Sequence, residues 1–233
     1  TTPIVLTRIT LGDKVGYGEA ALPPYLKETQ ESVCAFLELA KPVINSCSEP
    51  LNVDSIMQVV NALAPGNHAA KASIDIALHD VYGKLEGKPL WQIWGIDPDA
   101  TPCTSYTIGY DACDSIVLVK VQEADWAKIL KVKLGRGEAE DKRMITLIRS
   151  LSDKPIYVDA NQGWPTKEHA LMMCQWLAEQ GVVMIEQPMP KHMDEEHAWL
   201  CEQVELPILA DEACQTYDDV ARLAPYYDGI NIK

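Results

Sequence analysis

The second part of the chain is organised by short apolar runs that alternate with amphipathic stretches at near-constant spacing. Such alternation is typical of parallel βαβ units whose strands are buried on both faces. Six regularly spaced strands favour a (β/α) barrel, and an open doubly wound sheet remains the alternative, although no G-x-G-x-x-G turn supports a dinucleotide site. The predicted strands are 104–109, 129–135, 155–161, 182–188, 207–213 and 229–233, with helices between them at 139–152, 166–181 and 194–204.

The segment before these repeats has a different pattern. Residues 4–20 predict two antiparallel strands around a turn at Gly12-Asp13. Helical patterns follow at 27–44, 52–63 and 68–86. We therefore expect an α+β domain over residues 1–98 and a barrel domain over residues 99–233.

Three carboxylates occupy equivalent positions at the ends of three successive predicted strands. Asp159, Glu186 and Asp211 each follow an apolar run, which places each at the carboxyl end of its strand, where barrel active sites lie. A single carboxylate in such a place is more often a helix N-cap or a loop residue, but three in consecutive repeats favour a shared site. Oxygen ligands alone indicate a hard divalent cation, Mg²⁺, with Mn²⁺ as the alternative, and we expect the three carboxyl groups to converge within about 8 Å.

Lysines occupy two of the other predicted strands. Lys131 and Lys133 lie two residues apart on the second strand and point to the same face, and Lys233 ends the sixth strand. The second and sixth strands of an eight-stranded barrel lie on opposite sides, so we expect Lys133 and Lys233 to face each other across the mouth. Each lysine makes the other harder to protonate, which predicts a lowered lysine pKa. Two bases on opposite faces of a metal-chelated carboxylate substrate would invert a stereocentre through an enediolate, which predicts a racemase or epimerase.

The residues around these positions resemble known motifs. They are KVK at 131–133, VDANQGW at 158–164, IEQP at 185–188, ADEA at 210–213 and INIK at 230–233. In these motifs the chain resembles the muconate-lactonizing-enzyme subgroup of the enolase superfamily. Within that subgroup it resembles the dipeptide epimerases of the L-Ala-D/L-Glu type. GYGEA at 16–20 and the segment 73–95 resemble the capping domain of that family and its hinge into the barrel.

The resemblance implies a role for each matching position. It implies a dipeptide substrate, Mg²⁺ bound by Asp159, Glu186 and Asp211, and acid/base catalysis by Lys133 and Lys233. It also implies that Lys131 tunes Lys133 and contacts the substrate carboxylate, and that Asn161 supports the metal ligands. Thr107 would contact the substrate, although a strand threonine is more often a packing residue.

The chain also departs from the family pattern. Family members have a complete (β/α)₇β barrel, whereas this sequence ends at the sixth predicted strand and lacks the D-x-D motif with which dipeptide epimerases bind the substrate ammonium group. We therefore expect a capping domain that is incomplete at its N-terminal part, followed by a barrel truncated after the sixth strand. We further expect additional sequence or another chain to cover the open edges. A cycloisomerase, an o-succinylbenzoate synthase, an N-acylamino-acid racemase and a non-catalytic fragment remain the alternatives.

Composition restricts the partners. The net charge is −14, with 34 acidic and 20 basic residues, which argues against nucleic acid and anionic membranes. No apolar run reaches the length of a membrane span, and no signal segment opens the chain. Seven cysteines without a C-x-x-C pair favour reduced thiols in the cytoplasm. We expect a small-molecule partner, no nucleic acid and no membrane, and the sequence leaves a homo-oligomer open.

Overall fold

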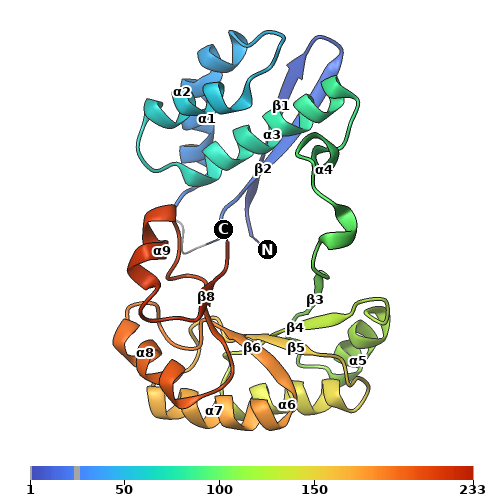
Figure 1. Ribbon diagram of the computed structural model, residues 1–233, viewed down its shortest axis with the longest axis vertical. Coiled ribbons are helices and arrows are strands. Elements are labelled where there is room, and N and C mark those ends of the chain that lie inside the picture. Colours follow the sequence, from blue (N-terminus) through green and yellow to red (C-terminus); the bar gives the residue numbers. More distant parts are fainter. Residues whose placement is uncertain (1, 24–26, 233) are drawn as a thin grey trace. The chain divides into compact units, whose positions relative to one another are not determined.

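The computed structural model describes residues 2–23 and 27–232 (Figure 1). The chain divides into two compact units, Thr1–Thr101 and Pro102–Lys233. Each unit has its own cluster of buried apolar side chains. No helix in the described ranges combines the length and the apolar character that crossing a membrane requires.

The first unit consists of a β-hairpin and helices. The two strands pair antiparallel along their whole length, from Ile4 with Ala21 to Leu11 with Lys14, which confirms the predicted hairpin. The elements in chain order are β1 (Ile4–Leu11), β2 (Lys14–Ala21), α1 (Gln30–Asn45), α2 (Val53–Leu63), α3 (His68–Glu86), α4 (Leu90–Ile93) and the 3₁₀ helix η2 (Pro98–Ala100).

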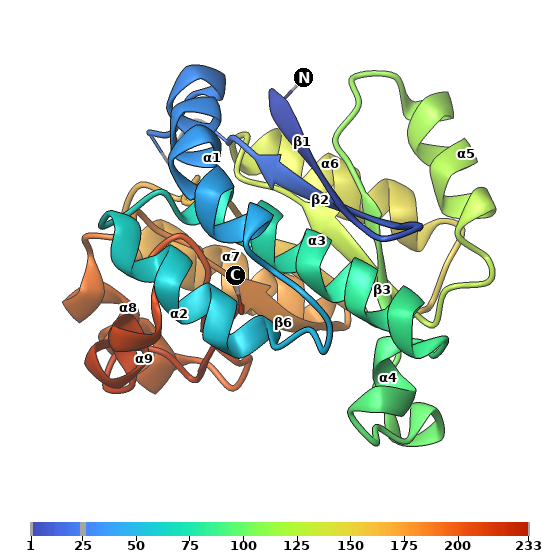
Figure 2. The ribbon, with the colours of Figure 1, turned by 90° about the horizontal axis from the view of Figure 1, so that it is seen from above.

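Two glycines allow the hairpin to lie directly on α3 (Figure 2). A Cβ atom at Gly18 would lie 1.9 Å from the carbonyl oxygen of Ser73, and one at Gly16 would lie 2.1 Å from the carbonyl oxygen of Ala77. The buried hydroxyl groups of Thr7 and Ser73 form a 2.7 Å hydrogen bond across the same contact. The glycines of the GYGEA motif are therefore explained by the close approach of strand and helix backbones.

We expect Gly18→Ala to destabilise the chain by about 3 kcal/mol, because the added methyl group cannot fit without moving a strand away from α3. Urea unfolding followed by circular dichroism measures this loss. Gly109→Ala is the matched control, since a methyl group there meets nothing within 4 Å. Equal stability of the two variants would show that the hairpin shifts on α3 without cost.

The second unit is built on a parallel sheet of six strands. The order of strands in the sheet is the order in the chain, as in a barrel, whereas a doubly wound sheet reverses its order at a switch point. The predicted fold of a capping unit followed by six barrel-type strands is thereby confirmed. The strands are β3 (Ser105–Ile108), β4 (Ile129–Lys133), β5 (Ile156–Asp159), β6 (Val182–Glu186), β7 (Ile208–Ala210) and β8 (Gly229–Ile230).

Helices connect successive strands, and α6 and α7 cover one face of the sheet (Figure 1). Along β4, Leu130 and Val132 are fully buried in the apolar core, and they alternate with Lys131 and Lys133. The two lysines therefore point to the opposite face from the helix-covered core. The connecting helices are α5 (Asp114–Glu123), α6 (Glu138–Arg149), α7 (Lys167–Glu179), α8 (Asp194–Gln203) and α9 (Tyr217–Leu223).

Candidate active site

Three carboxylates meet at the carboxyl ends of three neighbouring strands. Asp159 and Glu186 end β5 and β6, where they are paired in register, and Asp211 directly follows β7. These residues are 0%, 7% and 5% exposed, and one ligand oxygen from each lies within 4.8 Å of the others. The predicted convergence is confirmed. Three buried oxygen donors of this kind suit a hard divalent cation.

The two lysines of β4 contact these carboxylates. Lys131 Nζ lies 3.3 Å from Asp159 Oδ2 and also pairs with Glu186 Oε2. Lys133 Nζ pairs with the same Asp159 oxygen. Burial by itself would lower the pKa of Lys131, but the hydrogen bond to Glu186 and the charges of Asp159 and Glu186 outweigh burial and raise this pKa. Direct contact with carboxylate charges thus decides the direction of the shift at Lys131.

Two asparagines hold the carboxylates in place. Asn231 Nδ2 donates to Glu186 Oε1 at 2.8 Å and to Asp211 Oδ1 at 3.3 Å, and so bridges two of the three acids. The backbone N–H of Asn161 donates to Asp159 Oδ1 at 3.0 Å. Sequence reasoning selected Asn161 and missed Asn231. The signal was its position, since Asn231 follows β8 as Asp211 follows β7.

Gln187, the residue after Glu186, ties the ends of β6 and β7 together. Its side chain is fully buried, and Oε1 accepts hydrogen bonds from the backbone N–H groups of Asp211 at 2.9 Å and Ala213 at 3.1 Å. Its Nε2 donates to the Tyr227 hydroxyl at 3.1 Å and to the Met189 carbonyl at 3.2 Å. Gln187 thus fixes the backbone that carries Asp211. Sequence reasoning also missed this role.

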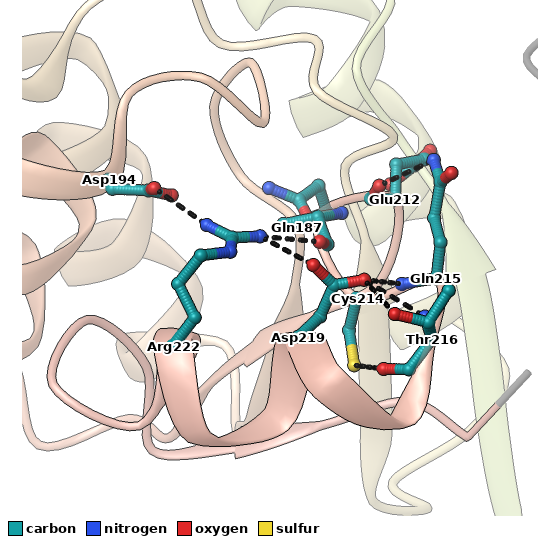
Figure 3. A network of polar contacts seen from close by, with 9 residues as sticks. Gln187, Asp194, Glu212, Cys214, Gln215, Thr216, Asp219 and Arg222 are labelled. Carbon is teal, nitrogen blue, oxygen red and sulfur yellow. Dashed lines mark hydrogen bonds and ion pairs between the residues drawn. The ribbon is translucent and has the colours of Figure 1, made fainter.

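The segment after Asp211 is held by an ion-pair network (Figure 3). Arg222 donates to Asp194 at 3.1 Å, to Asp219 at 3.0 Å and to the Ala213 carbonyl at 3.3 Å. The hydrogen bond from Arg222, with backbone N–H bonds from Gln215 and Thr216, lowers the pKa of Asp219 to about 2. The network ties the segment after Asp211 to α8 and α9.

Glu212 is a further buried acid beside the site that sequence reasoning did not select. It is 5% exposed, and its Oε1 accepts a 3.3 Å hydrogen bond from Asn161 Nδ2. Its Oε2 is buried without a hydrogen-bond partner among residues 2–23 and 27–232. Its place in the sequence could have indicated it, since Glu212 is the second acid of the ADEA motif, next to Asp211.

Two more residues were selected from the sequence, Thr107 and Lys233. Thr107 is exposed on β3 and is paired in register with Lys131, so it lies on the lysine side of the sheet edge. Lys233 lies outside the described residues. The structure therefore brings together Lys131, Lys133, Asp159, Glu186, Asp211 and Asn161.

Comparison with known families gives two matches that together span most of the chain. Residues 1–95 match the family model described as mandelate racemase / muconate lactonizing enzyme, N-terminal domain. Residues 117–232 match the model described as enolase C-terminal domain-like.

Curated relatives are named as epimerases. The chain is 50% identical over its whole length to the L-Ala-D/L-Glu epimerase of Bacteroides thetaiotaomicron and covers 60% of that protein. It is 37% identical to the L-Ala-D/L-amino acid epimerase of a Maribacter species, over 98% of this chain and 66% of that one. The chain thus spans about three fifths of the length of the Bacteroides relative.

Solved structures agree on the fold. A substrate-liganded complex of the L-Ala-D/L-Glu epimerase from Bacillus subtilis superposes with a TM-score of 0.84 at 26% identity, over 98% of this chain and 66% of that one. A structure of muconate lactonizing enzyme also gives a TM-score of 0.84 at 26% identity, over 99% of this chain and 67% of that one. The chain therefore belongs to the mandelate racemase/muconate lactonizing enzyme family of the enolase superfamily.

Proposed function

We propose that this protein is a Mg²⁺-dependent epimerase of dipeptides of the L-Ala-D/L-Glu class. The observation that carries the proposal is the group of three buried carboxylates, with ligand oxygens within 4.8 Å of one another, in contact with two lysines of one strand. The 50% identity to a relative named L-Ala-D/L-Glu epimerase supports the substrate class. The free cysteines support a reducing compartment, the cytoplasm.

The residues present fit a divalent metal. Asp159, Glu186 and Asp211 would hold it through oxygen atoms, the donor type that Mg²⁺ prefers, with Mn²⁺ as a substitute. Three carboxylates against the two ammonium groups of Lys131 and Lys133 leave an excess of negative charge that a cation would neutralise. When bound, the metal would stabilise the negative charge that develops on the substrate carboxylate as the α-proton leaves.

The lysines would move the α-proton. Lys133 would take it from one face of the substrate or return it there, and Lys131, which contacts Glu186 and Asp159, would position Lys133 and the substrate carboxylate. We assign the opposite face to Lys233. Asn231 would keep Glu186 and Asp211 oriented during this exchange.

The test is proton exchange in heavy water. With Mg²⁺ and L-Ala-L-Glu in D₂O, we expect nuclear magnetic resonance to show deuterium entering the α-position of the glutamyl residue together with formation of the D-epimer. Likeness of fold does not separate this reaction from cycloisomerisation, since the muconate lactonizing enzyme superposes equally well. Conversion of cis,cis-muconate with no exchange in any dipeptide would refute the proposal in favour of a cycloisomerase.

Metal binding can be tested without turnover. We expect calorimetry to show one Mn²⁺ or Mg²⁺ per chain, and Glu186→Gln to weaken this binding by more than about 100-fold, because loss of an outer partner alone typically costs about 10- to 100-fold. Glu202→Gln is the matched control, since Glu202 is exposed on α8. Unchanged metal affinity in Glu186→Gln would exclude this carboxylate as a ligand.

A further inference from the structure

A pocket of about 590 Å³ opens beside Lys133 at the carboxyl ends of β3, β4 and β5. The reacting carbon of the proposed substrate would lie next to Lys133, so this pocket is available to a group attached to that carbon. The lining residues are Tyr110, Lys133, Leu134, Gly135, Arg136 and Asn161.

Arg136 brings a positive charge to the wall of this pocket. Within the ranges 2–23 and 27–232 no carboxylate forms an ion pair with its guanidinium group, whereas the nearby Lys120, Lys142 and Arg143 are each paired with an acid. The guanidinium carbon lies 4.4 Å from the centre of the Tyr110 ring. Stacking on an aromatic face leaves the N–H donors at the edge of the guanidinium plane free to bind an anion.

The backbone of Arg136 is firmly held. Asp141, only 1% exposed, accepts hydrogen bonds of 3.0 Å from the N–H groups of Gly135 and Arg136 and another of 3.0 Å from Trp164 Nε1. Gly135 has φ +84°, and a Cβ there would lie 2.0 Å from the carbonyl oxygen of Ala160. The loop after Lys133 is thus packed against the β5 loop, and Arg136 is presented from a fixed position.

We propose that Arg136 binds an acidic side chain on the residue that is epimerised, and so selects dipeptides with a glutamate-like C-terminal residue. The inference rests on the proposed function. In that function the α-carboxylate would be bound by the metal and Lys131, and an ammonium group would be repelled by an arginine. The anionic side chain is the remaining group that an unpaired guanidinium in this pocket would attract, through two parallel charge-assisted hydrogen bonds.

The test compares protein variants against a pair of dipeptides that differ in one charge. The ligands are L-Ala-L-Glu and its amide analogue L-Ala-L-Gln, and the variants are Arg136→Gln, Arg136→Lys and the control Lys142→Gln. Lys142 is paired with Glu138 on α6 and does not line the pocket. Dissociation constants are measured by calorimetry with Mg²⁺ present, and kcat and KM by exchange in D₂O.

We expect Arg136→Gln to weaken binding of L-Ala-L-Glu by about 10- to 100-fold, as for loss of a charge-assisted pair. Its binding of L-Ala-L-Gln should change less than about twofold, and the loss for the glutamyl peptide should appear in KM. Arg136→Lys should restore part of the preference, because it keeps the charge and loses the planar fork. Lys142→Gln should keep the wild-type preference.

Equal weakening of both peptides by Arg136→Gln would overturn the inference and leave Arg136 a merely structural residue. An equal loss of preference in Lys142→Gln would overturn it as well, since net charge would then be the cause. Failure of the proposed function has a different signature. Wild-type protein that exchanges no α-proton, yet prefers the glutamyl peptide in an Arg136-dependent way, would refute the reaction and support the binding site.

Discussion

Replacing Lys133 with alanine is expected to abolish interconversion of the two epimers. Lys133 contacts Asp159 from the strand that borders the carboxylate group, and it lines the pocket beside which the substrate carbon is proposed to lie. Loss of a general acid–base group typically slows a reaction by about 10²- to 10⁴-fold. Because inversion needs both faces to be served, nuclear magnetic resonance should show no D-epimer forming from L-Ala-L-Glu in the variant.

Exchange of the α-proton in only one epimer distinguishes the loss of a single base from the loss of the whole site. If Lys233 serves the opposite face, Lys133→Ala should still exchange the α-proton of one epimer with deuterium while its configuration is retained. Lys128→Ala is the control and should leave interconversion unchanged, since Lys128 is exposed and precedes β4, away from the carboxylates. A Lys133→Ala protein that interconverts both epimers at a near wild-type rate would show that the two-base mechanism is wrong.

The positions of the three carboxylates and of the two lysines of β4 could be predicted because buried parallel strands are simple in sequence. Val158 and Ile185 are apolar and buried on the helix-covered side, so a charged residue that ends such a run, as Asp159 and Glu186 do, is visible without any alignment. Equivalent placement in successive repeats then brings the acids together. The alternation of side chains along a strand likewise predicts that Lys131 and Lys133 lie on one face of β4.

Helix α5 shows where this pattern fails. The alternating pattern calls for a helix between the first two barrel strands but gave no bounds for one at 114–123, where the apolar run 116–119 is rich in β-branched residues and is as typical of a strand as of a helix. The chain forms a helix there, with Val117 and Val121 buried four residues apart. Packing on the neighbouring elements decides the outcome, and packing is not readable from a short apolar run.

The amide residues of the site could not be predicted for a different reason. Asn231 bonds to Glu186, 45 positions away in the chain, and Gln187 to Asp211, 24 positions away, and amides have no characteristic spacing in sequence. The direction of the pKa shift of Lys131 could not be predicted, because a strand pattern gives the face of a side chain but not its contacts. Which charge lies nearest decides the direction of the shift.

Gln187 is expected to be the residue of the site whose loss costs most stability. Gln187→Met keeps the size of the side chain and removes its hydrogen bonds. The N–H groups of Asp211 and Ala213 would lose their acceptor, and the Met189 carbonyl and the Tyr227 hydroxyl would lose a donor. Each buried polar group left without a partner costs about 1 to 3 kcal/mol, so we expect the free energy of unfolding to fall by about 3 kcal/mol or more.

The polar neighbours of Gln187 lie in the same buried environment. Burial lowers the pKa of the neighbouring His197 and raises that of Tyr227, which favours the neutral form of both side chains. Urea unfolding measures the loss, and Gln215→Met is the control, because Gln215 is exposed and its side-chain amide donates to the nearby Glu212 carbonyl at 3.1 Å. The control should lose less than about 1 kcal/mol.

Since Gln187 holds the backbone of Asp211, the Gln187→Met protein should also bind Mn²⁺ more weakly even where it remains folded. A Gln187→Met protein as stable as the control, with wild-type affinity for Mn²⁺, would show that the ends of β6 and β7 are held by the strands alone.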